Sequence, residues 1–138
     1  MLTSAFLVSR EAVKGMIARK RGRIINICSV MSNVARASIA PYSASKAALA
    51  NLTRGMAVDW AKHGINVNGI APGYIRTELN EALLQNVEFN AWVEKRTPLG
   101  RWADPSELGG AAIFLASDAS TYVSGHILYV DGGFTATV

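Results

Sequence analysis

Three short apolar runs constrain the fold of this chain more than any other feature of its sequence. Residues 24–28 (IINIC) are rich in branched side chains and apolar on both faces, which is typical of a buried strand in a parallel sheet rather than a half-exposed hairpin strand. Residues 65–70 and 126–130 are two further strand candidates. Turn-forming residues follow them at 71–73 and 131–133.

Segments with helical spacing of apolar residues separate these strands. The predicted helices are, in order, residues 2–20, 42–63, 78–85, 88–96 and about 105–117. Gly64 stands where a helix C-terminal cap is expected. Asp104, Pro105 and Glu107 match an N-cap, a first-turn proline and a capping box. Strands that alternate with helices predict an α/β fold with a parallel, doubly wound sheet.

This predicted sheet is small for its class. It has three strands, whereas sheets usually have about five or six. The chain also starts inside a predicted helix, without the strand that should precede it. We therefore expect the sheet to lack strands on its N-terminal side.

Composition indicates a folded chain and excludes several classes. Half of the 138 residues are hydrophobic and 17% are charged, which suffices for a core and does not fit disorder. No apolar stretch approaches the roughly 20 residues that span a bilayer, and we expect neither a membrane segment nor a signal peptide. Cys28 is the single cysteine, so no internal disulfide forms and a cytoplasmic location is expected.

The net charge of +4 includes a basic cluster just after the first predicted helix, at Arg19, Lys20, Arg21 and Arg23. One interpretation is a nucleic-acid patch. However, no aromatic residues interleave with the cluster, and cations at this place complement the negative end of a helix dipole. We expect no nucleic-acid partner. The two histidines lack acidic or cysteine neighbours at ligand spacing, so no metal site is expected.

Tyr42 and Lys46 are the first candidates for chemistry. They are four residues apart at the start of a predicted helix and therefore share one face. A nearby ammonium and the positive helix N-terminus both favour the phenolate form of a tyrosine, which suits proton transfer at neutral pH. Ser29 follows the first strand, at the sheet edge where α/β folds present ligands.

A Tyr-x-x-x-Lys pair alone is weak evidence, because such a pair also occurs by chance on an exposed helix face. The combination is more specific. Ser29 precedes Tyr42 by thirteen positions, and Pro72–Gly73 ends the next strand.

With these residues in place, four segments make the chain similar to the short-chain dehydrogenase/reductase family from residue 2 to its end. They are GRIINICSVMS, PYSASKAALANLTRGMAVDWAKHGINVNGIAPGYIRTEL, PLGRWADPSELGGAAIFLASDAS and GHILYVDGG. The resemblance implies the C-terminal portion of a Rossmann-like sheet. It also implies an oxidoreductase that interconverts an alcohol and a ketone with NAD or NADP.

The resemblance also implies residue roles. Ser29 would orient and polarise the substrate carbonyl or hydroxyl, and Tyr42 would be the general acid/base. Lys46 would bind the nicotinamide ribose and assist the tyrosine. The remaining implied cofactor contacts come from one segment: Pro72 and Gly73 against the nicotinamide, the Ile75 backbone on its carboxamide, and Thr77 on the carboxamide or pyrophosphate.

Within the family, the chain is most similar to gluconate 5-dehydrogenases, through IINICS with Ser32 and Arg36, NGIAPGY and RTPLGRW. A substrate of the gluconate/5-ketogluconate type follows as an expectation. Arg36 either meets a sugar-acid carboxylate or is a solvated loop arginine. Residues 74–96 match the family's substrate lid. A homo-oligomer, dimeric or tetrameric, is implied as well.

The chain departs from the family at its N-terminus. The Gly-rich phosphate turn, the residue that selects NAD or NADP and the Asn-Asn-Ala-Gly segment are all missing, and Met1 stands where a fourth catalytic residue, an Asn, is expected. We therefore interpret residues 1–138 as a single, N-terminally truncated domain with little activity alone. A non-catalytic remnant or assembly partner is the alternative.

Overall fold

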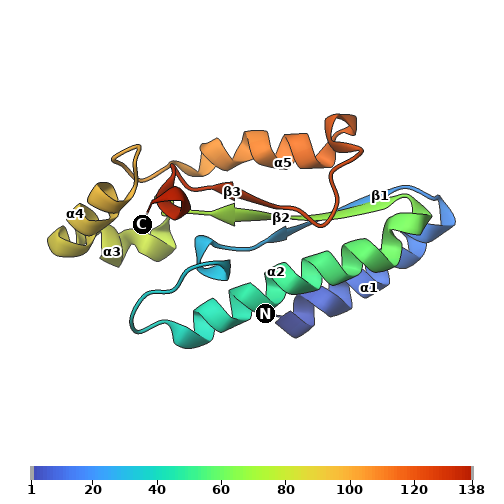
Figure 1. Ribbon diagram of the computed structural model, residues 1–138, viewed down its shortest axis with the longest axis horizontal. Coiled ribbons are helices and arrows are strands. Elements are labelled where there is room, and N and C mark those ends of the chain that lie inside the picture. Colours follow the sequence, from blue (N-terminus) through green and yellow to red (C-terminus); the bar gives the residue numbers. More distant parts are fainter. Residues whose placement is uncertain (1, 138) are drawn as a thin grey trace.

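The computed structural model describes residues 2–137. They form a three-stranded parallel sheet with helices on both faces, shown in Figure 1. The strands are β1 (Gly22–Ile27), β2 (Ile65–Pro72) and β3 (Ile127–Val130). The helices are α1 (Leu2–Ala18), α2 (Ala40–Trp60), α3 (Glu81–Gln85), α4 (Val87–Arg96) and α5 (Gly109–Ala116). Short 3-10 turns occupy Val30–Ser32, Ala61–His63, Glu78–Asn80, Pro105–Leu108, Asp118–Ser120 and Phe134–Ala136.

The sheet order is β1-β2-β3, and both pairings are parallel. This confirms the α/β class and the parallel sheet. Helices α1 and α2 cover one face, and α5 covers the other (Figure 1). Helices α3 and α4 lie beyond the carboxyl ends of the strands (Figure 1), which is the edge where parallel sheets bind ligands.

The core between the sheet and the α1–α2 layer is apolar, with one satisfied polar pair inside it. Val13, Met56 and Val67 belong to its buried cluster. Asn26 of β1 donates from Nδ2 to the Thr53 Oγ1 at 2.9 Å, and the Thr53 hydroxyl donates to the Leu49 carbonyl. The pair therefore fixes β1 against α2 without leaving a buried polar group unpaired.

Helix and strand ends differ in detail from the predicted ones. The first helix ends at Ala18 rather than residue 20, and Gly64 caps the second helix with a left-handed φ of 73°. Pro72 was expected to lie beyond the end of its strand, but it is the last residue of β2 and pairs with Val130. The strand tolerates it because the N–H of Gly73, not of residue 72, donates to the Val130 carbonyl at 3.0 Å.

The basic cluster after α1 has a second explanation in the structure. Arg21 and Arg23 both contact Asp118, with N–O distances of 3.0 and 3.1 Å. The helix-dipole interpretation does not account for these two arginines, because α1 has no basic residue in its last turn. They connect the start of β1 to the turn after α5.

The start of α5 confirms the predicted capping box. Glu107 accepts the Asp104 N–H at 2.8 Å and binds Arg101 through two contacts of 2.8 Å. The first turn is 3-10, over Pro105–Leu108, and the α-helix follows it. Hydrogen bonds from Arg101 and then from the Asp104 N–H lower the pKa of Glu107 to about 2.

This pKa shift predicts a pH-dependent contribution to stability. The Glu107 pKa is lower in the folded chain than its ordinary value of 4.5, so the stabilisation is present above that value and is lost as pH falls toward 2. We expect Glu107→Gln to lower the melting temperature at pH 7, and the difference to shrink from pH 5 downward. Melts followed by circular dichroism between pH 3 and 7 check this. In an Arg101→Met background the same substitution should show a smaller pH dependence, because only the Asp104 N–H bond then lowers the Glu107 pKa, and an undiminished dependence would contradict the role of Arg101.

Candidate active site

The sequence-predicted site residues gather at the carboxyl ends of β1 and β2. Ser29 follows β1 by two residues, Tyr42 and Lys46 lie in the first turns of α2, and Gly73 follows β2 directly. Ser29, Tyr42 and Gly73 line one pocket of about 320 Å³. The complete lining is Ser29, Val30, Met31, Arg36, Ile39, Tyr42, Gly73, Tyr74, Leu79, Asn80 and Leu83.

Ser29 is held in place by the turn that it begins. Its side chain is 7% exposed, and its Oγ accepts the Met31 N–H at 3.1 Å. The Ser29 N–H in turn donates to Ser32 Oγ at 3.3 Å. The hydroxyl oxygen is therefore fixed by the backbone, and its O–H hydrogen can still be donated to a ligand.

Lys46 links the end of β1 to Tyr42. Its Nζ donates to the Ile27 carbonyl at 2.7 Å and lies 5.8 Å from the centroid of the Tyr42 ring. Lys46 is only 9% exposed, whereas Tyr42 is 42% exposed. The four-residue spacing predicted from the sequence thus places a confined ammonium beside an accessible phenol.

The segment after β2 passes close to β3, and this requires glycine at position 73. A Cβ on Gly73 would lie 2.8 Å from the Cα of Asp131, which is backbone and cannot move aside. Ile75 then bridges to Ala103: the Arg76 N–H donates to the Ala103 carbonyl, and the Ala103 N–H donates to the Tyr74 carbonyl. Both bonds come from the neighbours of Ile75.

The backbone groups of Ile75 itself therefore point away from that bridge. Its carbonyl accepts Asn80 Nδ2 at 2.8 Å, and its N–H has no partner among residues 2–137. Its side chain is buried. Thr77 is exposed at the start of the next 3-10 turn. Neither Pro72 nor Thr77 lines the pocket, and Ile75 contributes to a neighbouring hollow instead.

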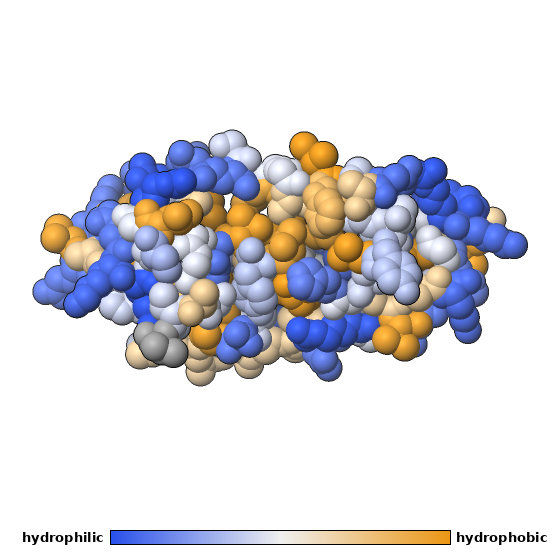
Figure 2. Space-filling model, turned by 45° about the horizontal axis from the view of Figure 1, so that its top comes forward, coloured by the Kyte–Doolittle hydropathy of each residue, from blue (hydrophilic) through white to orange (hydrophobic). Residues whose placement is uncertain are grey.

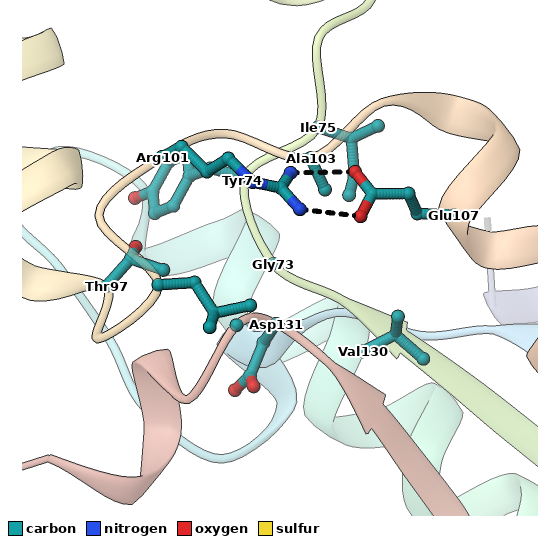
Figure 3. Close-up of a pocket in the computed structure, with 11 residues that line it drawn as sticks. Gly73, Tyr74, Ile75, Thr97, Arg101, Ala103, Glu107, Val130 and Asp131 are labelled. Atoms are coloured by element: carbon teal, nitrogen blue, oxygen red, sulfur yellow. Dashed lines mark hydrogen bonds and ion pairs between the residues drawn. The ribbon is translucent and has the colours of Figure 1, made fainter.

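That neighbouring hollow, of about 140 Å³, shares Gly73 and Tyr74 with the pocket. Figure 3 shows the Arg101–Glu107 pair near Ile75 and Ala103, and Asp131 below Gly73. Asp131 accepts hydrogen bonds from the N–H groups of Gly133 and Thr135. The charged groups around this hollow, Arg101, Glu107 and Asp131, are thus all bonded within the protein, which favours a structural role for the hollow.

Tyr74 is the pocket residue that sequence reasoning did not single out. Its ring packs edge-on against Phe89, Trp92, Trp102 and Phe134. Its place directly after Pro72–Gly73, at a strand end, was the signal that pointed to it. Burial raises the pKa of its hydroxyl, and the neighbouring Arg36 charge opposes that shift.

Two tryptophans pack against the Tyr74 ring. Trp102 is 1% exposed, and Trp92 belongs to the same aromatic cluster. No group of three or more potential metal ligands occurs among residues 2–137, and no helix in that range is long and apolar enough to cross a membrane. The expected Asn position falls on Met1, outside the described residues.

Comparisons with known proteins show which chains this one is similar to. A family model described as enoyl-(acyl carrier protein) reductase matches residues 1–135. The 5-keto-D-gluconate 5-reductase of Escherichia coli K12 is 54% identical over 136 residues, and the gluconate 5-dehydrogenase of Gluconobacter oxydans is 52% identical over 137. Each alignment covers 99% of this chain and 54% of the relative, so the chain spans about half the length of these relatives.

A solved structure matches equally well. The gluconate 5-dehydrogenase of Burkholderia cenocepacia, crystallised with NADP and tartrate, superposes with a TM-score of 0.95 and is 56% identical. The match covers 97% of this chain and 52% of that chain.

Proposed function

Because the chain belongs to the short-chain dehydrogenase/reductase family, we propose that it forms the catalytic half of an NAD(P)-dependent oxidoreductase acting on a sugar acid. The reaction interconverts a secondary alcohol and a ketone, as between gluconate and 5-ketogluconate. The observation that carries this proposal is the single pocket lined by Ser29, Tyr42 and Gly73 at the strand ends, with Lys46 beside Tyr42.

Tyr42 moves the proton. In the oxidation direction its phenolate takes the proton of the substrate hydroxyl, and in the reduction direction its phenol returns a proton to the new alkoxide. Its exposure of 42% leaves the hydroxyl accessible to a ligand. Lys46, held by the Ile27 carbonyl, stabilises the negative charge on Tyr42 during this transfer.

Ser29 holds the reacting oxygen. Its Oγ is fixed by the Met31 N–H, so its remaining O–H donates toward the carbonyl or alkoxide that lies against Tyr42. A preorganised donor of this kind stabilises charge that develops on oxygen without having to reorient.

The residues after β2 fit a nicotinamide. The N–H of Ile75 points away from the Ala103 bridge and lacks a partner among the described residues, so it suits the carboxamide oxygen. Pro72 and Gly73 would lie against the ring, and Thr77, exposed beyond them, would reach the carboxamide or pyrophosphate. When bound, the nicotinamide supplies or accepts the hydride. The NADP in the Burkholderia relative supports a nicotinamide dinucleotide as the cofactor.

Arg36 is the candidate for the substrate carboxylate. It lines the pocket, and its guanidinium lies 5.1 Å from the Phe89 ring centroid. The names of the gluconate-related relatives support an anionic sugar substrate, for which an arginine is the suitable partner.

An oligomer in the cytoplasm belongs to the same proposal, supported by the exposed apolar residues Ile113 and Phe114 on α5 and by the buried free thiol of Cys28.

Figure 2 shows hydrophobic residues across the middle of the face that α5 covers, between hydrophilic ends. Such a surface is typical of contact sites between proteins. It also supports the alternative function, an assembly partner without activity of its own, which the activity test below distinguishes from the enzyme.

A chimera tests the proposed function. This chain replaces the matching part of the Escherichia coli relative, with which it shares 54% identity, so that the other half supplies the remaining strands. We expect the chimera to reduce 5-ketogluconate with NADPH or NADH, and the 138-residue chain alone to show little turnover. A folded chimera that is inactive with both cofactors would favour the non-catalytic alternative.

A further inference from the structure

The hydroxyl of Tyr74 is buried and has no hydrogen-bond partner among residues 2–137. Most buried hydroxyls in native proteins are paired, because leaving one unpaired destabilises the fold. Tyr74 nevertheless occupies the wall of the pocket that holds Ser29 and Tyr42. An unpaired donor at such a place suggests that its partner is a ligand.

The position of this hydroxyl is set by packing. The Tyr74 ring centroid lies 5.2 Å from that of Trp102 and 5.4 Å from that of Phe134, in edge-on contacts. Phe89 and Trp92 complete the enclosure at 5.7 and 6.0 Å. Because rings on several sides confine it, Tyr74 cannot turn its hydroxyl toward another internal acceptor.

The groups that face this hydroxyl are those of the proposed substrate site. Arg36 and Tyr42 both act electrostatically on Tyr74, and burial keeps its phenol in the protonated form, which donates. Arg36 lies near enough to the Tyr74 hydroxyl to lower its pKa by charge and by a hydrogen-bond contact, but no hydrogen bond of normal geometry joins the two, and the Arg36 Nη1 donates to the Ala37 carbonyl at 3.3 Å. A guanidinium contact would use the Tyr74 oxygen as an acceptor and leave its O–H hydrogen available to a ligand.

The contacts of the Arg36 side chain are weak. It belongs to the loop before α2, where its Nη1 forms that long bond and its guanidinium lies 5.1 Å from the centroid of the Phe89 ring. A carboxylate that drew the guanidinium toward itself would uncover the Tyr74 hydroxyl and meet both donors together.

We propose that Tyr74 is a specificity-determining residue that donates a hydrogen bond to an oxygen of the sugar acid, next to the carboxylate contact of Arg36. This inference rests on the proposed function and adds a residue to it. The hydroxyl is kept for ligand binding at a cost to the stability of the ligand-free protein.

The test compares Tyr74→Phe with Tyr122→Phe, a control at a fully exposed tyrosine. Gluconate is titrated into the 138-residue chain and its two variants, and chemical shifts are followed by NMR. Melting temperatures are measured without ligand. We expect Tyr74→Phe to raise the dissociation constant for gluconate about five- to tenfold, as the loss of one hydrogen bond predicts, and to leave the melting temperature equal or higher. Tyr122→Phe should change neither.

The outcomes separate the inference from the function on which it rests. Equal gluconate affinity in Tyr74→Phe and the unsubstituted chain overturns the role of Tyr74 and leaves the proposed substrate class standing. A lowered melting temperature in Tyr74→Phe also overturns it, because the hydroxyl would then have an internal partner. If the unsubstituted chain binds no gluconate, while a circular dichroism spectrum shows it folded, the substrate class itself is wrong and the inference falls with it.

Discussion

Tyr42→Phe in the active chimera is expected to lower kcat by about 10²- to 10⁴-fold, the usual contribution of a general acid/base. The substitution removes one hydroxyl from a residue that is 42% exposed, so the fold and the cofactor affinity should stay unchanged. Steady-state rates of NADPH oxidation with 5-ketogluconate measure the loss. A fluorescence titration with NADPH verifies that binding is intact.

Two further variants make this result specific. Tyr122→Phe removes a hydroxyl far from the pocket and should leave kcat unchanged. Lys46→Met is a second test rather than an inert control: it keeps most of the apolar side chain but removes the ammonium that lies 5.8 Å from the Tyr42 ring, and it should also lower kcat. Full activity in Tyr42→Phe would show that another group transfers the proton.

Trp102→Ala is expected to cost about 3–5 kcal/mol of unfolding free energy, as truncation of a buried aromatic residue usually does. Trp102 is 1% exposed, and its ring contacts those of Tyr74 and Phe89. Its indole N–H has no hydrogen-bond partner in the described part of the chain, so the loss comes from packing alone. Because whole domains are stable by only about 5–15 kcal/mol, this loss is a large share of the total, and the urea midpoint of the variant should fall strongly.

Trp92→Ala is the matched control for this experiment. Trp92 contacts the same Tyr74 ring but is 40% exposed, so less area returns to water and the loss should be clearly smaller. Urea unfolding followed by far-UV circular dichroism compares the two, since fluorescence would change with either tryptophan. Equal losses would mean that the aromatic cluster does not depend on burial of Trp102.

Local signals made most of the fold predictable. Branched runs identified all three strands, and Gly64 and the Asp104–Glu107 box identified a helix end and a helix start. These features depend on neighbouring residues and are therefore visible in sequence. The extension of β2 through Pro72 was not, because it depends on pairing with Val130 from a distant segment.

The candidate site likewise has residues that could be predicted from the sequence and residues that could not. The Tyr42–Lys46 spacing follows from helix geometry, and Ser29 follows from its place after a strand. Tyr74 could have been found from its place directly after Pro72–Gly73, but the aromatic wall around it could not be predicted, because Phe89, Trp102 and Phe134 come from separate segments that meet only in the folded chain. The Arg21–Asp118 pair, 97 residues apart in sequence, is invisible for the same reason.

The parallel order of the strands also governs how fast this chain can fold. Each ladder joins residues far apart in sequence, as in the pairing of Gly69 in β2 with Ile127 in β3. Loop closure over such distances costs entropy before any ladder bond repays it. Helices α1 and α2 should therefore form within microseconds, before the sheet is complete. The apolar strand β1 is exposed during this interval, so a high protein concentration favours aggregation over folding at this stage.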